Sequence, residues 1–289
     1  MKNINKVIFV KCILFAIISA ILSTPLQLFN SIVIEGQTGK PEFVTIPFLL
    51  YGVSMKVFFA LGYVLLGYKL PVKNTRLRAQ IYYLLLWGSS YMPNILAMVG
   101  GDGEIIKASF SATIVIFDSV SYIIDGFALG LLMKNYNSDM EVTVFSKSKL
   151  LLSGIVNGGI FVLLTFVFDL VAGCINPSWY LYIILGVSEA CKVKFYLIFL
   201  IFMFIAGMFQ SVWYRYTQYP DTSCKGNVIW TLQFGILIWN PVVLIMIFFG
   251  TAVAETICYA IIFLITILLC TLIYSNLFFR KATYANGVK

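Results

Sequence analysis

The sequence contains no histidine among its 289 residues. This absence excludes Ser-His and Cys-His nucleophile systems, zinc and haem sites with histidine ligands, and histidine proton relays. The six cysteines show no CxxC spacing, so a cysteine-only metal site is not expected either. No Walker A sequence is present, which indicates that the chain does not hydrolyse ATP by itself. We therefore expect no metal ion and no cofactor.

Charged residues are scarce as well. They make up 11% of the chain, against roughly 25% in a soluble domain, while 61% of the residues are hydrophobic and the mean hydropathy is +0.94. Such a chain cannot cover its surface with polar groups, so its solvent is expected to be largely lipid. The net charge of +8 is not gathered into the basic, aromatic-interleaved patch that nucleic-acid binding requires. The expected partner is the lipid bilayer, and no nucleic acid is expected.

Long apolar runs predict the fold class. A helix needs about 20 apolar residues to cross a bilayer, and such runs occur near 7–33, 45–69, 80–99, 106–133, 150–173, 194–214, 228–249 and 255–279. The first run follows a basic start but is long and lacks a cleavage site, which indicates a retained signal anchor. We expect an all-α polytopic membrane bundle of about eight transmembrane helices, forming a single transmembrane domain over 1–289.

The lysines and arginines between these runs predict the topology. Fourteen of the 20 fall in segments on one side, including 69–78, 134–149 and 280–289. Four fall on the other side, at Lys40, Lys107, Lys192 and Lys194. The positive-inside rule then places both termini in the cytoplasm, and we expect a bacterial cytoplasmic (inner) membrane.

One segment on the expected outer side is irregular. Its apolar core, within 175–194, is too short to cross the bilayer and suits an interfacial or re-entrant helix. Cys174 and Cys191 bracket it, and in an oxidising compartment they could form a disulfide. The alternative is that both are small apolar residues without a bond between them.

The two halves of the chain show a similar order of features. Each half has a span ending near a proline (Pro71, Pro220), then a basic loop, then a span with a tryptophan (Trp87, Trp239). This order is consistent with a parallel 4+4 tandem repeat of halves 1–134 and 150–289, joined by the cytoplasmic loop 135–149. Shared membrane composition is the alternative explanation.

Ionisable groups deep inside the runs are the first candidates for function. Counted from the cytoplasmic ends of their helices, Lys56 lies at ~20 Å, between Asp118 at ~24 Å and Asp125 at ~14 Å. Asp118 and Asp125 are seven residues apart, so they share one helix face. Lys56 could pair with either carboxylate. The functional interpretation is a cation- or proton-responsive site in a transport path, and the structural one is an ion pair that holds two helices together.

Prolines inside the runs free backbone carbonyl groups, and two of them have an amide neighbour. Asn240, which precedes Pro241, therefore joins Lys56, Asp118 and Asp125 as a candidate transport-site residue. Asn157 and Gln210 are expected to form hydrogen bonds between helices.

Three functional hypotheses follow. The first is a permease or permease subunit, acting alone, as a homo-oligomer or in a membrane complex. The second is a non-catalytic membrane scaffold, such as an immunity, assembly or trafficking factor. The third is a lipid-acting membrane enzyme, which lacks a recognisable catalytic set. Intramembrane aspartyl proteases carry their aspartates on two helices, whereas Asp118 and Asp125 share one. We expect a protein that is not an enzyme.

Overall fold

The computed structural model describes residues 6–38, 46–91, 108–134, 136, 146–175, 189–218, 223–239, 241 and 253–279. Every regular element within these ranges is a helix, and none of the described residues lies in a strand. Eight of the described elements are α-helices. The all-α class predicted from the apolar runs is confirmed.

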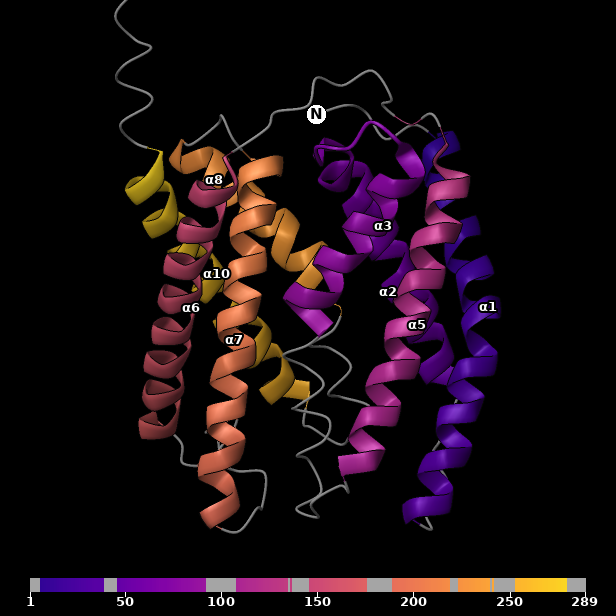
Figure 1. Ribbon diagram of the computed structural model, residues 1–289, viewed down its shortest axis with the longest axis horizontal. Coiled ribbons are helices and arrows are strands. Elements are labelled where there is room, and N and C mark those ends of the chain that lie inside the picture. The colour runs from indigo at the N-terminus through magenta and orange to yellow at the C-terminus, as the bar shows by residue number, and fades with distance from the viewer. Residues whose placement is uncertain are drawn as a thin grey trace, which may run out of the picture. The chain divides into compact units, whose positions relative to one another are not determined.

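Each apolar run overlaps one α-helix, two of them only in part (Figure 1). The helices are α1 (Lys6–Thr38), α2 (Ile46–Leu65), α3 (Thr75–Leu86), α5 (Ala108–Leu132), α6 (Lys147–Ile175), α7 (Glu189–Thr217), α8 (Cys224–Phe234) and α10 (Val253–Phe278). A 3-10 turn, η1 (Gly67–Lys69), follows α2. Two π-helical turns, η2 (Trp87–Tyr91) and η4 (Gly235–Trp239), directly follow α3 and α8.

Helices α3 and α8 start earlier than the predicted spans 80–99 and 228–249 that they overlap. The reason is N-capping by short polar side chains upstream of the apolar runs. The side chain of Asn74 accepts hydrogen bonds from Arg76 N and Leu77 N, and that of Ser223 accepts one from Gly226 N. Residues 92–107 and 242–252, in which these spans were expected to end, lie outside the described residues.

The Asn74 cap gives a first prediction. Asn74→Ala should lower the free energy of unfolding by about 1 kcal/mol, because two backbone N–H groups lose their acceptor. Thermal unfolding of the detergent-solubilised protein measures the change. Asn74→Ser is the control and should stay close to wild type, since serine caps equally well. Equal losses in both variants would contradict a capping role.

Within the described ranges, three helices are long and apolar enough to cross a membrane, over Lys6–Leu26, Ser148–Phe168 and Thr256–Phe278. Their apolar side chains point outward. On α10, Ile257, Ile261 and Ile265 are exposed at helical spacing, whereas Thr266 and Thr271 are buried. A water-soluble helix has the opposite arrangement, so this pattern indicates lipid contact.

The chain divides into two compact units. Unit 1 comprises Met1–Trp87 and Ile105–Val142, and unit 2 comprises Gly88–Glu104 and Thr143–Lys289. The boundary after Val142 falls inside the loop 135–149 that the sequence suggested as the joint, although residues 88–104 group with unit 2.

The helices pack in the same order inside each unit. In unit 1, α1 packs against α2 and α5, and α3 packs against α5. In unit 2, α6 packs against α7 and α10, and α8 packs against α10. Each unit thus has two long helices, one shorter capped helix and a long fourth helix.

Candidate functional site

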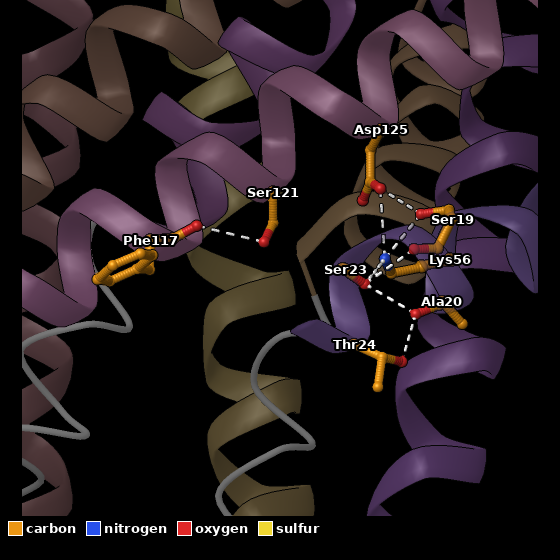
Figure 2. Close-up of polar contacts among 8 residues, drawn as sticks. All are labelled: Ser19, Ala20, Ser23, Thr24, Lys56, Phe117, Ser121 and Asp125. Atoms are coloured by element: carbon orange, nitrogen blue, oxygen red, sulfur yellow. Dashed lines mark hydrogen bonds and ion pairs between the residues drawn. The ribbon is translucent and has the colours of Figure 1, made fainter. Parts of the chain in front are cut away.

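Four polar side chains from three helices meet inside unit 1 (Figure 2). The ammonium group of Lys56 on α2 lies 3.3 Å from Asp125 Oδ1 on α5. It also donates hydrogen bonds to Ser19 Oγ at 2.7 Å and Ser23 Oγ at 2.8 Å, both on α1. Ser19 Oγ in turn donates to Asp125 Oδ1. We call these four residues the unit 1 cluster.

The cluster is enclosed by protein. The side chain of Lys56 is 11% exposed and that of Asp125 is 7% exposed. A lone charge at such a site is costly, whereas a paired and hydrogen-bonded one is tolerated. The lysine ammonium has three protons, and each has an acceptor here: two serine hydroxyls and one carboxylate oxygen.

Helical spacing brings the two serines together. Ser19 and Ser23 are one turn apart on α1, so they lie one above the other on the same face. Phe15 and Ala16 are buried on that face too, while Ile17 and Ile21 are exposed on the other. Ser23 Oγ also donates to Ser19 O at 2.8 Å, which orients its lone pairs toward Lys56.

Two glycines let α5 approach α3 closely and so position Asp125. A Cβ atom at Gly130 would lie 2.9 Å from Arg76 Cα, and one at Gly126 would lie 2.8 Å from Gln80 Oε1. Gln80 reaches across to α5, because its Nε2 donates to Ile123 O at 3.1 Å. Asp125 thus lies next to Gly126. A larger residue in place of Gly126 would displace Gln80.

The structure places the predicted site residues unequally. Lys56 contacts Asp125 and not Asp118, which is half-buried two turns away on the same helix. Ser121, between the two aspartates, donates to the backbone oxygen of Phe117 on its own helix. Of the predicted stripe, the described contacts thus join Lys56 to Asp125.

Two other predicted positions have different outcomes. Asn240 lies outside the described residues. Cys174 is an exposed free thiol. The side chain of Cys191, its possible disulfide partner, lies outside the described part. The disulfide stays a prediction.

Sequence reasoning missed Ser19 and Ser23. A signal was present, because two serines four residues apart in a long apolar run mark a face turned away from lipid. Serine hydroxyls in such runs often bond only to their own helix, as Thr24 Oγ1 does to Ala20 O. The spacing alone therefore did not distinguish a cluster from local bonds.

Tyrosines from α3 and α5 lie beside Asp125. The rings of Tyr83 and Tyr122 pack edge to face with centroids 6.0 Å apart, and both phenols are within electrostatic range of Asp125. Tyr83 is 1% exposed, and its hydroxyl has no hydrogen-bond partner among the described residues. All contacts of Asp125 within the described part use Oδ1. Asp125 Oδ2 and the Tyr83 hydroxyl can therefore each form a further hydrogen bond next to the ion pair.

The hydrogen-bond directions limit the chemistry of the cluster. A serine beside a neutral lysine can act as a nucleophile. Here the hydroxyl protons of Ser19 and Ser23 go to Asp125 Oδ1 and Ser19 O, so both contacts with Lys56 use lysine protons. With these directions Lys56 acts as a donor to both serines and does not accept the proton of either. The arrangement suits charge sensing better than acyl transfer.

No family model matches the chain, and no curated protein or solved structure matches it.

Proposed function

We propose that the chain is a multi-pass membrane protein of the permease or permease-subunit class. It has about eight transmembrane helices with both termini in the cytoplasm, and the bacterial inner membrane is its compartment. Three apolar helices of sufficient length, with isoleucines outside and polar groups inside, support the membrane part of the proposal.

The repeated helix order supports transport. Many transporters consist of two repeats, and short or interrupted helices at corresponding positions of the repeats mark their binding regions. In this chain α3 and α8 are the third helices of their units, and each is followed directly by a π-helical turn. π-helical turns are frequent at functional sites.

The buried Lys56–Asp125 pair is the single observation that carries the proposal of a charge-responsive site. Ionisable residues within membrane helices are expensive and mark ion pathways and proton relays. This pair joins three helices, so a change in its charge alters the packing of α1, α2 and α5 together.

Transport assays with one neutral variant test this function. Purified protein is reconstituted in liposomes containing a pH-sensitive dye, and pools of amino acids, sugars and nucleosides are added outside. Asp125→Asn should reduce substrate-dependent proton movement at least about tenfold, a loss of ~1.4 kcal/mol of transition-state stabilisation. The amide keeps the shape of the carboxylate but removes its charge.

Ser121→Ala is the matched control, because Ser121 lies on the same helix and bonds only to its own backbone in the described contacts. It should transport like wild type. Full activity of Asp125→Asn would contradict a role for the charge, and absence of movement with every pool in wild type would contradict a proton-coupled permease.

A non-catalytic scaffold is the second candidate, and one observation favours it. The ion pair is closed, and every proton of Lys56 is used, as in a clamp whose purpose is stability. Such a protein would act through another copy or another membrane subunit. The scaffold predicts that a double neutral variant, Lys56→Met with Asp125→Leu, is fully functional in cells, whereas the permease predicts that it is inactive.

A further inference from the structure

Unit 2 contains a polar cluster that joins the same three positions of its helix order. Asn157 on α6 donates to Gly207 O at 2.6 Å and to Gln210 Oε1 at 3.3 Å, both on α7. Gln210 Nε2 donates across to α10, to Ile267 O at 3.4 Å and Thr271 Oγ1 at 3.3 Å. The interhelical hydrogen bonds predicted for Asn157 and Gln210 are thereby confirmed. Asn157, Gln210 and Thr271 form the unit 2 cluster.

The two clusters occupy corresponding places. Each joins the first, second and fourth helices of its unit, with a long side chain from the second helix as the bridge: Lys56 in unit 1 and Gln210 in unit 2. Asp125 lies seven residues before the end of α5 at Leu132, and Thr271 lies seven residues before the end of α10 at Phe278. The second and third helices also meet through edge-to-face ring pairs in both units, Tyr63 with Tyr82 and Tyr214 with Trp230.

Unit 2 therefore serves as an internal comparison for unit 1. The unit 2 cluster joins three helices through amide and hydroxyl groups. The buried guanidinium of Arg215 on α7 also links these helices, because its Nε donates to the Tyr274 hydroxyl on α10, which donates to Ser153 Oγ on α6. Neutral hydrogen bonds between membrane helices are inexpensive to bury, whereas an ion pair carries a desolvation penalty. The described contacts give the unit 2 cluster no carboxylate, whereas the unit 1 cluster contains Asp125.

The surroundings of Asp125 point to a proton as the ligand of the charged cluster. A metal cation needs several oxygen ligands, but the Lys56 ammonium already lies 3.3 Å from Oδ1 and would repel it. Among the described residues no group of three or more Cys, Asp or Glu side chains could hold a metal. The titratable groups described around the cluster are Lys56 and Tyr51 from α2, Tyr82 and Tyr83 from α3, Cys12 from α1, and Asp118 and Tyr122 from α5.

We propose that Asp125 is the proton-binding site of this protein, with Lys56 as its fixed counter-charge, and that the unit 2 cluster is its uncharged structural counterpart. A proton from water adds to Oδ2, beside the Tyr83 hydroxyl, and the cluster goes from neutral to a charge of +1. The attraction between α2 and α5 is lost, while Lys56 keeps its hydrogen bonds to Ser19 and Ser23. Release of the proton restores the ion pair. The inference deepens the proposed function and rests on it.

Infrared difference spectroscopy of the full chain in lipid nanodiscs tests the site directly. Acidification of wild type should produce a carboxylic-acid band that Asp125→Asn lacks and Asp118→Asn retains. The band should shift in Tyr83→Phe, because the Tyr83 phenol interacts electrostatically with Asp125 and has no hydrogen-bond partner among the described residues. In Lys56→Met the acid form should already be present at neutral pH, since the counter-charge is gone. If wild type and Asp125→Asn give the same difference spectrum, the proposal is overturned.

A neutral graft tests the correspondence of the clusters. Ser19→Asn, Lys56→Gln and Asp125→Thr together rebuild the unit 1 cluster with the residues of unit 2. The graft should fold, unfold within about 5 °C of wild type, and lose the acid-induced band. Lys56→Gln with Asp125→Asn is the second neutral version and changes less volume. If neither version folds while wild type does, charge is needed to join the helices, and the proposal is wrong.

The two experiments also separate this inference from the proposed function. If the Asp125 band appears but no substrate pool is transported, the proton site is supported and the permease function is contradicted. If Asp125→Asn still transports and wild type shows no Asp125 band, the permease function is supported and the proton site is contradicted.

Discussion

Lys56→Met is expected to lower the free energy of unfolding by about 3–5 kcal/mol, the largest loss for a single substitution in unit 1. The methionine removes the counter-charge of Asp125, so the buried group must take up a proton to fold, and it deprives both serines of their donor. Titration of the purified protein with SDS in mixed micelles, followed by circular dichroism, measures the loss. Lys11→Met on α1 is the control, since Lys11 is half-exposed, and it should change stability by less than about 1 kcal/mol.

The double variant Lys56→Met with Asp125→Leu separates the two contributions to that loss. It removes both charges, so most of the stability should return, because a well-packed apolar pair is often as stable as the ion pair it replaces. A double variant as unstable as Lys56→Met would show that the hydrogen bonds to α1, rather than the unpaired carboxylate, account for the loss.

Gly207→Ala is expected to destabilise unit 2 by about 1–3 kcal/mol. Its Cβ would lie 2.7 Å from Phe161 Cβ, 2.9 Å from Gly158 Cα and 3.0 Å from Asn157 O, atoms that cannot move without separating α6 from α7. Gly158→Ala should behave alike, with its Cβ 2.7 Å from Phe204 O. Gly207 O also accepts the hydrogen bond of Asn157, so the unit 2 cluster is displaced as well.

Gly159→Ala provides the matched control one residue away. Nothing lies within 4 Å of a Cβ at Gly159, so alanine should stabilise α6 by about 0.5–1 kcal/mol through helix propensity. The same SDS titration reads both substitutions. Opposite signs at Gly158 and Gly159 are the expected result, and equal effects would contradict close packing of α6 on α7.

Both predictions depend on small or polar residues that the apolar runs conceal. A run of about 20 apolar residues predicts a helix because the backbone must satisfy its own hydrogen bonds in lipid, and each of the eight runs overlaps a helix in the described part of the chain. Where a helix starts depends instead on individual caps such as Asn74 and Ser223, which lie outside the apolar periodicity.

The candidate site was predictable in part. Lys56 and Asp125 stand out from sequence because a charge in an apolar run needs a partner, and depth counting brought them to similar heights. That counting could not choose between Asp118 and Asp125. The two lie on the same face, and the choice depends on how α2 is rotated and packed against α5.

Composition and periodicity thus determine the class, the helices and the few residues able to carry charge, since these follow from the cost of exposing polar groups to lipid. The partners of those residues follow from packing. Gly126 and Gly130 bring α5 onto α3, and the inward face of α1 presents Ser19 and Ser23 to Lys56. Contacts of this kind join residues that are far apart in the chain. They depend on how each helix is rotated and on how closely the helices approach, so they follow from the tertiary structure and not from the local sequence.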